Sequence, residues 1–189
     1  SKNVQITIKY GWDLTLDHSV LFCCNNMWRG IYHENLTKLI TKNYTIIEDA
    51  LTAINATNTQ GVILSIDRTN FNRNRIGIFL QNNYNDPLNP KIIKFIANSF
   101  SCSRPMFHPE IVSYAGILTK NVSLYLNSTT LKSSYLSTKY NGLKFGIYSY
   151  GDIIDITLRG QMFKNIKYYG VNLLKGNLDV KASVFEDVF

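Results

Sequence analysis

The chain has 189 residues, a length typical of one domain. Hydrophobic residues make up 45% of it and aromatic residues 13%, which is enough to form a core and excludes a disordered chain. The net charge is +7 at pH 7, and the apolar runs are too short to span a bilayer.

The first elements are predicted to be strands. Residues 4–9 alternate between apolar and polar side chains, as in a half-buried strand. Residues 16–24 form a second predicted strand, and residues 28–32 follow Asn25-Asn26 as the returning strand of a hairpin.

The region from residue 35 to residue 55 has helical character. Thr45 and Glu48 have the spacing of a capping box, in which each side chain caps a backbone N–H group. Ile47, Ala50 and Ile54 then fall on one helical face. We therefore expect one short helix here, packed on the edge of a sheet.

The remaining elements are short strands at intervals of 10 to 15 residues, separated by turn signals. Asn141-Gly142 predicts a tight hairpin before the strand at 143–150. This spacing predicts a mainly β fold, a two-layer antiparallel β-sandwich with one short helix, over residues 1–163. The side chains expected in its core are Trp12, Leu21, Leu64, Ile78, Ile93, Phe95, Leu124 and Phe145.

Residues 164–189 are predicted to be a C-terminal extended segment. Leu178, Val180, Ala182 and Val184 alternate with polar residues, and an exposed strand with such an apolar side favours pairing at a sheet edge. The segment is therefore either a strand added to its own domain or an arm exchanged between copies.

No motif indicates catalysis. The three histidines, His18, His33 and His108, lack the spacing of a metal site or a catalytic triad, and no phosphate-binding glycine loop occurs. We therefore expect a protein that is not an enzyme and that needs no cofactor.

The chain has three cysteines, Cys23, Cys24 and Cys102, and an odd number favours free thiols in a reducing compartment. The five Asn-x-Ser/Thr sequons keep secretion open as an alternative.

Positive charge is concentrated between residues 68 and 144, where the net charge is +8. A basic field of this kind attracts nucleic acid, an acidic protein or an anionic surface, although a solvated face is the alternative. The candidate basic patch comprises Arg68, Arg73, Arg75, Lys91, Lys94 and Arg104. Aromatic and basic residues interleave at 71–75, 135–145 and 163–169, a pattern that single-stranded nucleic acids can use for stacking.

Residues 6–13 end in Gly-Trp-Asp, and residues 16–22 lead from Asp17 into an apolar run. Together with Asp67 in the loop at 65–70, they resemble the tellurium-resistance stress-protein (TerD-like) family over residues 4–151. The resemblance implies a β-sandwich that binds calcium. Here, however, Thr15 replaces one acid of the family pattern and arginines crowd the loop after Asp67, so only Asp13, Asp17 and Asp67 stay as weak calcium candidates.

The sequence thus predicts a non-enzymatic binding or scaffold module of the cytoplasm or of a virion, similar to TerD-like proteins, with lost or weak calcium binding. One alternative is a structural subunit of a viral or phage particle that exchanges its C-terminal arm. The other is a nucleic-acid-binding domain that uses the basic residues from 68 to 144.

Overall fold

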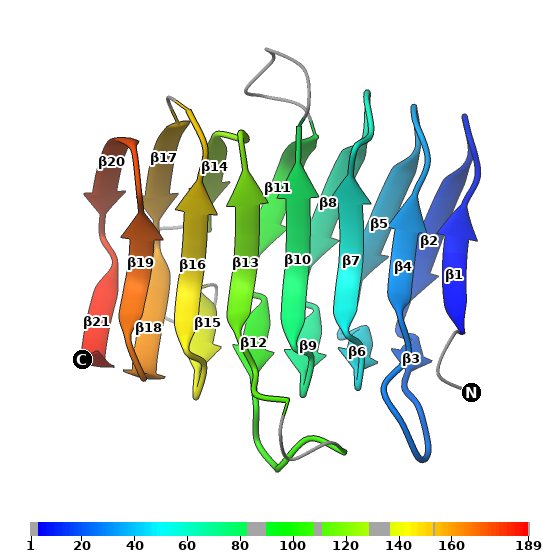
Figure 1. Cartoon of the computed structure of the whole chain (residues 1–189), viewed down its shortest axis with the longest axis horizontal. Coiled ribbons are helices and arrows are strands. Elements are labelled where there is room, and N and C mark those ends of the chain that lie inside the picture. Colours follow the sequence, from blue (N-terminus) through cyan, green and yellow to red (C-terminus); the bar gives the residue numbers. More distant parts are fainter. Residues whose placement is uncertain (1–3, 83–89, 108–110, 129–136, 153, 189) are drawn as a thin grey trace.

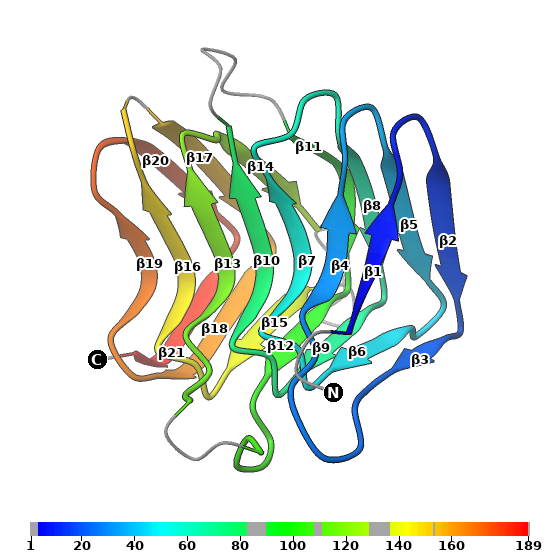
Figure 2. The same ribbon diagram turned by 45° about the vertical axis from the view of Figure 1, so that its right-hand side comes forward.

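The chain forms a parallel β-solenoid. The computed structural model describes residues 4–82, 90–107, 111–128, 137–152 and 154–188. Within these ranges there is no helix, and the paired strands run parallel to one another. Successive strands turn around a common axis and stack coil upon coil, as Figures 1 and 2 show. The predicted antiparallel two-layer β-sandwich is therefore wrong, and so is the sandwich that the resemblance to TerD-like proteins implied.

The described residues form seven coils, and each coil contributes one strand to each of three faces. Face A, which is turned toward the viewer in Figure 1, contains β1 (Gln5–Ile8), β4 (Gly30–His33), β7 (Thr52–Thr57), β10 (Ile76–Gln81), β13 (Ala115–Lys120), β16 (Phe145–Tyr150) and β19 (Tyr169–Leu173). Face B contains β2 (Asp13–Asp17), β5 (Lys38–Lys42), β8 (Ile63–Asp67), β11 (Lys91–Ile96), β14 (Leu124–Asn127), β17 (Ile154–Arg159) and β20 (Gly176–Lys181). Face C contains β3 (Val20–Leu21), β6 (Ile46–Glu48), β9 (Asn70–Asn72), β12 (Ser99–Ser101), β15 (Thr138–Asn141), β18 (Gln161–Ile166) and β21 (Val184–Val188).

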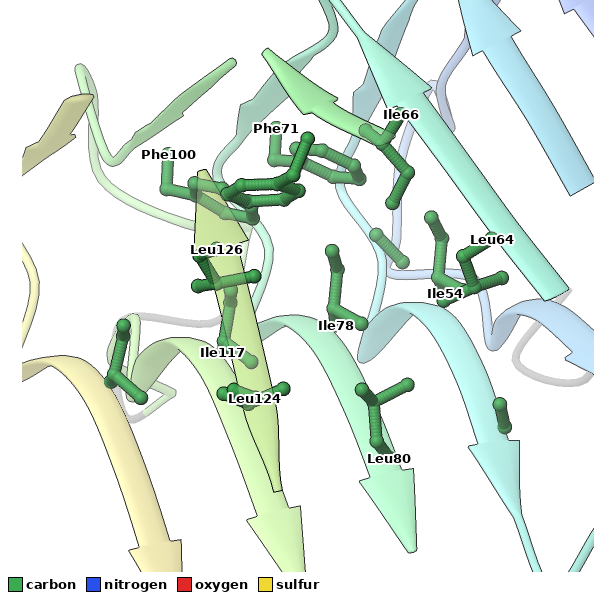
Figure 3. Packing of buried hydrophobic residues seen from close by; sticks show 14 of the residues in the cluster. Ile54, Leu64, Ile66, Phe71, Ile78, Leu80, Phe100, Ile117, Leu124 and Leu126 are labelled. Atoms are coloured by element: carbon green, nitrogen blue, oxygen red, sulfur yellow. The ribbon is translucent and has the colours of Figure 1, made fainter. Parts of the chain in front are cut away.

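The core consists of rows of like side chains that run along the solenoid axis. Residues in register on neighbouring parallel strands lie about 4.8 Å apart, so identical apolar side chains pack directly on one another. One row on face A is made of fully buried isoleucines, namely Ile31, Ile54, Ile78, Ile117 and Ile147. Figure 3 shows three of them pointing into the interior, opposite Leu64 and Leu124 of face B.

Aromatic rings form a second row, on face C. Phe71, Phe100, Tyr140, Phe163 and Phe185 occupy one register position in five successive coils. Their ring centroids are 4.6, 5.1, 4.6 and 4.8 Å apart, and neighbouring planes are within 13° of parallel. The first two rings are visible in Figure 3. We call this row the ring ladder.

A row of glycines on face A makes room for the ring ladder. Gly77, Gly116, Gly146 and Gly170 stand at the second position of β10, β13, β16 and β19. A Cβ atom on Gly77 would lie 2.6 Å from the ring of Phe100, and one on Gly116 would lie 2.6 Å from the ring of Tyr140. Any larger residue would therefore overlap a ring, so the glycines let the backbone of face A approach the ladder.

Polar side chains form a row at the corner between faces B and C. The row contains Ser19, Thr45, Thr69, Asn98, Thr138, Gln161 and Ser183. At several of these positions the backbone N–H donates a hydrogen bond to the side chain of the next coil, as from Thr69 to Asn98 Oδ1 at 3.0 Å and from Gln161 to Ser183 Oγ at 3.2 Å. The corner therefore satisfies donors that the turn takes out of the sheets.

Two local predictions fail for the same reason. The predicted helix near residue 47 is instead β6 and β7, and the Thr45 hydroxyl donates to the Lys42 carbonyl at 2.8 Å as part of the polar corner row. Asn141-Gly142 does not close a hairpin, because β15 and β16 belong to different faces. Gly142 instead adopts a φ of +70° in a corner between face C and face A. In both regions each turn sends the chain to the next face rather than back along the same one.

The predicted core is partly wrong. Leu64, Ile78, Phe95 and Leu124 are buried and Leu21 and Phe145 are half-buried, but Trp12 and Ile93 have 71% and 54% of their surface exposed. Trp12 lies in the turn before β2, and Ile93 lies where the register of β11 shifts.

Residues 164–188, the described part of the predicted C-terminal segment 164–189, continue the solenoid. The boundary predicted after residue 163 falls inside β18, and the segment supplies β19, β20 and β21, which pair with β16, β17 and β18 of the same chain.

We expect Gly116→Ala to lower the free energy of unfolding by about 1–3 kcal/mol, because the methyl group would overlap the Tyr140 ring. Urea denaturation followed by circular dichroism would measure it. The same substitution in a Tyr140→Leu background should cost less, since the leucine lacks the ring, although the Gly146 carbonyl 2.8 Å away remains. An equal cost in both backgrounds would contradict the proposed coupling of the glycine row to the ring ladder.

A buried histidine interrupts the apolar interior of the second coil. His33 is 7% exposed, and its Nδ1 lies 2.8 Å from the hydroxyl of Thr37. Burial lowers the pKa of His33 from 6.5 to about 4, because the imidazolium ion loses its hydration. The unfolded chain therefore binds a proton between these pH values while the folded chain does not, so stability is full above pH 6.5 and falls as the pH drops toward 4.

Lowering the pH from 7.5 to 5.0 should therefore reduce the free energy of unfolding by about 2 kcal/mol through His33 alone. Denaturation at the two pH values, compared between the wild type and His33→Gln, isolates this contribution, since the glutamine does not titrate. If both proteins show the same pH dependence, His33 is not the group responsible.

Candidate functional site

The three aspartates predicted as weak calcium candidates all lie on face B but do not converge. Asp13 and Asp17 stand at opposite ends of β2, and Asp67 is the last residue of β8. Strand β5, which ends at Lys42, lies between β2 and β8. Asp17 and Asp67 each have a cation beside them: Lys42 Nζ lies 3.1 Å from Asp17, and Lys94 Nζ lies 2.8 Å from Asp67. The described residues contain no group of three or more His, Cys, Asp or Glu side chains placed to hold a metal ion.

The charges around Asp67 explain its ionisation. Burial raises its pKa, but hydrogen bonds from Arg68 and Lys94 outweigh burial and leave the pKa below its ordinary value. Arg68 donates from both Nε and Nη2 at 3.2 Å. Asp67 is thus a carboxylate already paired with two cations, an arrangement that does not favour a third.

The predicted basic patch is divided between two sides of the solenoid. Lys91 and Lys94 lie on face B and Arg68 follows β8 of that face, whereas Arg73, Arg75 and Arg104 lie where face C turns toward face A. Three of the six cations are held in ion pairs with carboxylates, namely Arg68, Arg73 and Lys94. The six residues therefore do not form one anion-binding surface.

Arg73 has a structural role. Its Nε and Nη2 atoms donate to the two carboxylate oxygens of Asp49 at 2.8 and 2.6 Å. The Asp49 side chain is 2% exposed and that of Arg73 is 14% exposed. Such a bidentate pair fixes both corner turns, because removal of either partner leaves a largely buried charge.

A different group of residues gathers on the outer side of face A, over coils four to seven. Its aromatic members come from the turn before β13, from β16, from the turn before β19 and from the first residue of β19, and they are Tyr114, Phe145, Tyr148, Tyr150, Tyr168 and Tyr169. Its cationic members are Arg75, Lys120, Lys144 and Lys167. We call this set the aromatic–cationic surface. Sequence reasoning noted the interleaved residues at 135–145 and 163–169 but not that three coils bring them together.

The rings of this surface touch one another but are not covered. Phe145 lies at the centre, with ring centroids 5.0 Å from Tyr148, 5.1 Å from Tyr114 and 5.7 Å from Tyr168. Most of these pairs are tilted by 41° to 67°, unlike the parallel rings of the ring ladder. Tyr168 and Tyr169 are 42% and 57% exposed. Apolar surface of this kind, in contact with water, is typical of binding sites.

The electrostatic environment of this surface is positive. The strands β10, β13, β16 and β19, all fully described, contain no acidic residue. Lys144 and Lys167 both lie over the ring of Tyr168, with Nζ 5.9 and 5.5 Å from its centroid. Neither lysine has an ion-pair partner in the described part of the chain.

A pocket adjoins this surface at the corner between faces C and A. It has a volume of about 360 Å³ and is bounded by the turn that leaves β12 and by the turns before β16 and β19. Cys102 lines it and is half-buried, and burial raises the pKa of its thiol. A second cavity, of about 420 Å³, lies beside Trp12, but its lining comes from the first coil alone. The corner pocket, which is built from three coils, is the better defined of the two.

The remaining candidates of the sequence lie elsewhere. Cys23 and Cys24 stand in the turn between β3 and β4, and all three cysteines are free. Among the described residues, no helix is long and apolar enough to cross a membrane.

Comparison of the chain with known protein families, with curated proteins and with solved structures finds no match.

Proposed function

We propose that the chain is a non-enzymatic binding module that holds extended polyanions on the aromatic–cationic surface. The observation that supports this proposal is the gathering of six exposed or half-exposed rings and four cations on one face, whose described strands β10, β13, β16 and β19 contain no acidic residue. Cations attract the charged groups of such a ligand, and rings stack on its flat units.

The other two faces are less suited to this function. On them, cations stand beside carboxylates, as in the pairs Lys42–Asp17, Lys94–Asp67 and Lys164–Glu186. A cation that already has an acidic partner gains little from a polyanion, since the ligand must compete with that partner.

The shape of face A also favours an extended ligand. Its strands lie side by side at about 4.8 Å, so equivalent side chains of coils five, six and seven form rows parallel to the solenoid axis. Lys120, for example, is in register with Tyr150, and Phe145 is in register with Tyr169. A chain of repeating anionic units laid along these rows would meet a ring or a cation in each coil.

We expect the wild type to bind both a sulfated oligosaccharide and an oligothymidylate at low salt, and Arg75→Gln/Lys120→Gln to weaken this binding. For oligothymidylate, the slope of log affinity against log salt should fall by about 1.4, since about 0.7 is lost per neutralised phosphate contact. Fluorescence anisotropy of labelled ligands would measure both quantities. The ligand with the higher affinity shows which class of polyanion the surface prefers.

The matched control is Lys38→Gln/Lys91→Gln, which removes the same charge from face B. It should retain the wild-type affinity. Tyr150→Ala/Tyr169→Ala should weaken binding by about 1–3 kcal/mol per lost stacking contact while leaving the salt slope unchanged. If the control and the face A variant lose the same affinity, the ligand is held by diffuse charge attraction and the proposal is contradicted. The proposal is also contradicted if the wild type binds neither ligand.

One observation favours assembly as a second candidate function. In the seventh coil, Leu178 and Phe185 are 46% and 47% exposed, whereas Ile156 and Phe163, their neighbours in register in the sixth coil, are buried. If the first coil of a second copy stacked on this seventh coil in the same register, its Leu14 would lie next to Leu178 and its Leu21 would lie next to Phe185. The same register would place Asp17 beside Lys181. Such a head-to-tail contact does not close on itself and produces filaments.

For this second candidate, sedimentation velocity of the wild type should show species that grow with protein concentration. Leu178→Asp/Phe185→Asp should abolish them, because it places charge on the contact. The control Tyr125→Asp/Leu174→Asp alters two side chains that are more exposed, at 56% and 61%, and lie outside the interior rows, so it should leave the assembly intact. A wild type that stays monomeric at every concentration would rule out stacking.

A further inference from the structure

The corner pocket combines an apolar lining with two cations. Its apolar part includes Met106, Ile111, Val112 and Leu143, and its cations are Lys144 and Lys167. Its volume of about 360 Å³ falls in the range of small-molecule sites, roughly 300–1,000 Å³. No acidic residue belongs to the described lining.

Backbone hydrogen bonds fix the two walls of the pocket. The N–H of Lys144 donates to the carbonyl of Ser113 at 3.2 Å, and the N–H of Lys167 donates to the carbonyl of Leu143 at 2.9 Å. The hydroxyl of Ser113 donates to the carbonyl of Asn74 at 2.8 Å, which anchors the end of the wall before β13 to the fourth coil. The turns of three successive coils are thus joined, so the pocket does not depend on a single loop.

The two lysines are placed to accept an anion. Both ammonium groups lie within 6 Å of the centroid of one ring, that of Tyr168, so two like charges are held in the same region. Two cations without acidic partners in the described structure repel each other, and an anion between them relieves that repulsion. Both lysines also line the corner pocket, together with the apolar side chains of Met106 and Leu143.

We infer that the corner pocket binds a small amphipathic anion, with its apolar body among Met106, Ile111, Val112 and Leu143 and its charged group between Lys144 and Lys167. The apolar lining favours an aliphatic or aromatic body over a free inorganic anion, which would gain nothing from those side chains. The lysines select a carboxylate or sulfonate over a neutral or cationic head group. This site is separate from the rows of face A that hold the polyanion in the proposed function, although Lys144 and Lys167 border both.

The test uses 8-anilinonaphthalene-1-sulfonate, an aromatic anion whose fluorescence rises in apolar surroundings, and decanoate as a competitor. We expect decanoate to displace the part of the fluorescence that comes from the pocket, while decanol and decyltrimethylammonium displace it at least tenfold less well. Lys144→Gln/Lys167→Gln should weaken the binding of decanoate at least tenfold and leave the binding of decanol unchanged. Equal displacement by all three would show an apolar surface without anion selectivity and overturn the inference.

A second variant separates the pocket from other apolar surfaces, such as the seventh coil. Val112 lies at the exposed side of the pocket, so Val112→Trp should fill it without disturbing the core. This variant should lose the decanoate-sensitive signal but keep the polyanion affinity of the wild type. If the signal persists, the probe binds elsewhere and the inference is wrong. If the protein binds no polyanion but decanoate binding changes in the variants as predicted, the proposed function is wrong and the inference about the pocket is still supported.

Cys102 supplies a readout that needs no probe. Its half-buried thiol lines the pocket, whereas Cys24 is exposed in the turn between β3 and β4. Alkylation of the two thiols, followed by mass spectrometry, should show that decanoate slows modification of Cys102 severalfold and leaves Cys24 unaffected. If decanoate slows the alkylation of both thiols, or of neither, decanoate does not occupy this pocket.

Discussion

The steric fit between the glycine row and the ring ladder is the constraint on which the rest of the molecule depends. Faces A and C meet at a corner (Figure 2). The rings of face C fill the space next to the glycines of face A, because a Cβ atom on Gly77, Gly116, Gly146 or Gly170 would lie within 3 Å of a ring. Since a Cβ on Gly77 or Gly116 would overlap a ring, the two faces can approach this closely only where glycine occurs. Stacking of the rings then fixes the register from coil to coil. The corner between faces C and A, where the pocket and the aromatic–cationic surface meet, takes its shape from this packing.

Because each coil contacts only its neighbours, insertions at corners leave the interior rows intact. The strands β12 and β13 are separated by residues 102–114, whereas β9 and β10 are separated by only three residues. The register from Phe71 through Phe100 to Tyr140 nevertheless continues without a shift. The chain can therefore build a pocket from a longer corner without a loss of core packing. This separation of scaffold from site is common where loops carry function on a rigid framework.

Strand positions could be predicted from the sequence, but their arrangement was missed. The strands predicted at residues 4–9 and 143–150 correspond to β1 and β16, since a half-buried strand gives the same pattern in a sandwich and in a solenoid. The repeat that distinguishes the two is present at residues 76–79, 115–118, 145–148 and 169–172, where glycine is followed by Ile or Val. Its steps of 39, 30 and 24 residues are unequal because the corners differ in length, so no fixed period appears. The helix predicted near Ile47 failed because tertiary packing in two short strands overrode a local capping pattern.

The same geometry explains why the candidate site could not be read from runs of charge. In a solenoid, consecutive segments of the chain turn to different faces, so neighbours in sequence separate in space. Arg68 and Arg73, five residues apart, thus lie at different corners, each paired with its own carboxylate. Residues one coil apart become neighbours instead, which is how Lys144 and Lys167 come to share the ring of Tyr168. Carboxylates neutralise several of the cations on faces B and C, while the described strands of face A in coils four to seven have none. Face A thus combines exposed rings with cations that have no carboxylate partner in the described structure, and the proposed polyanion site depends on this coincidence.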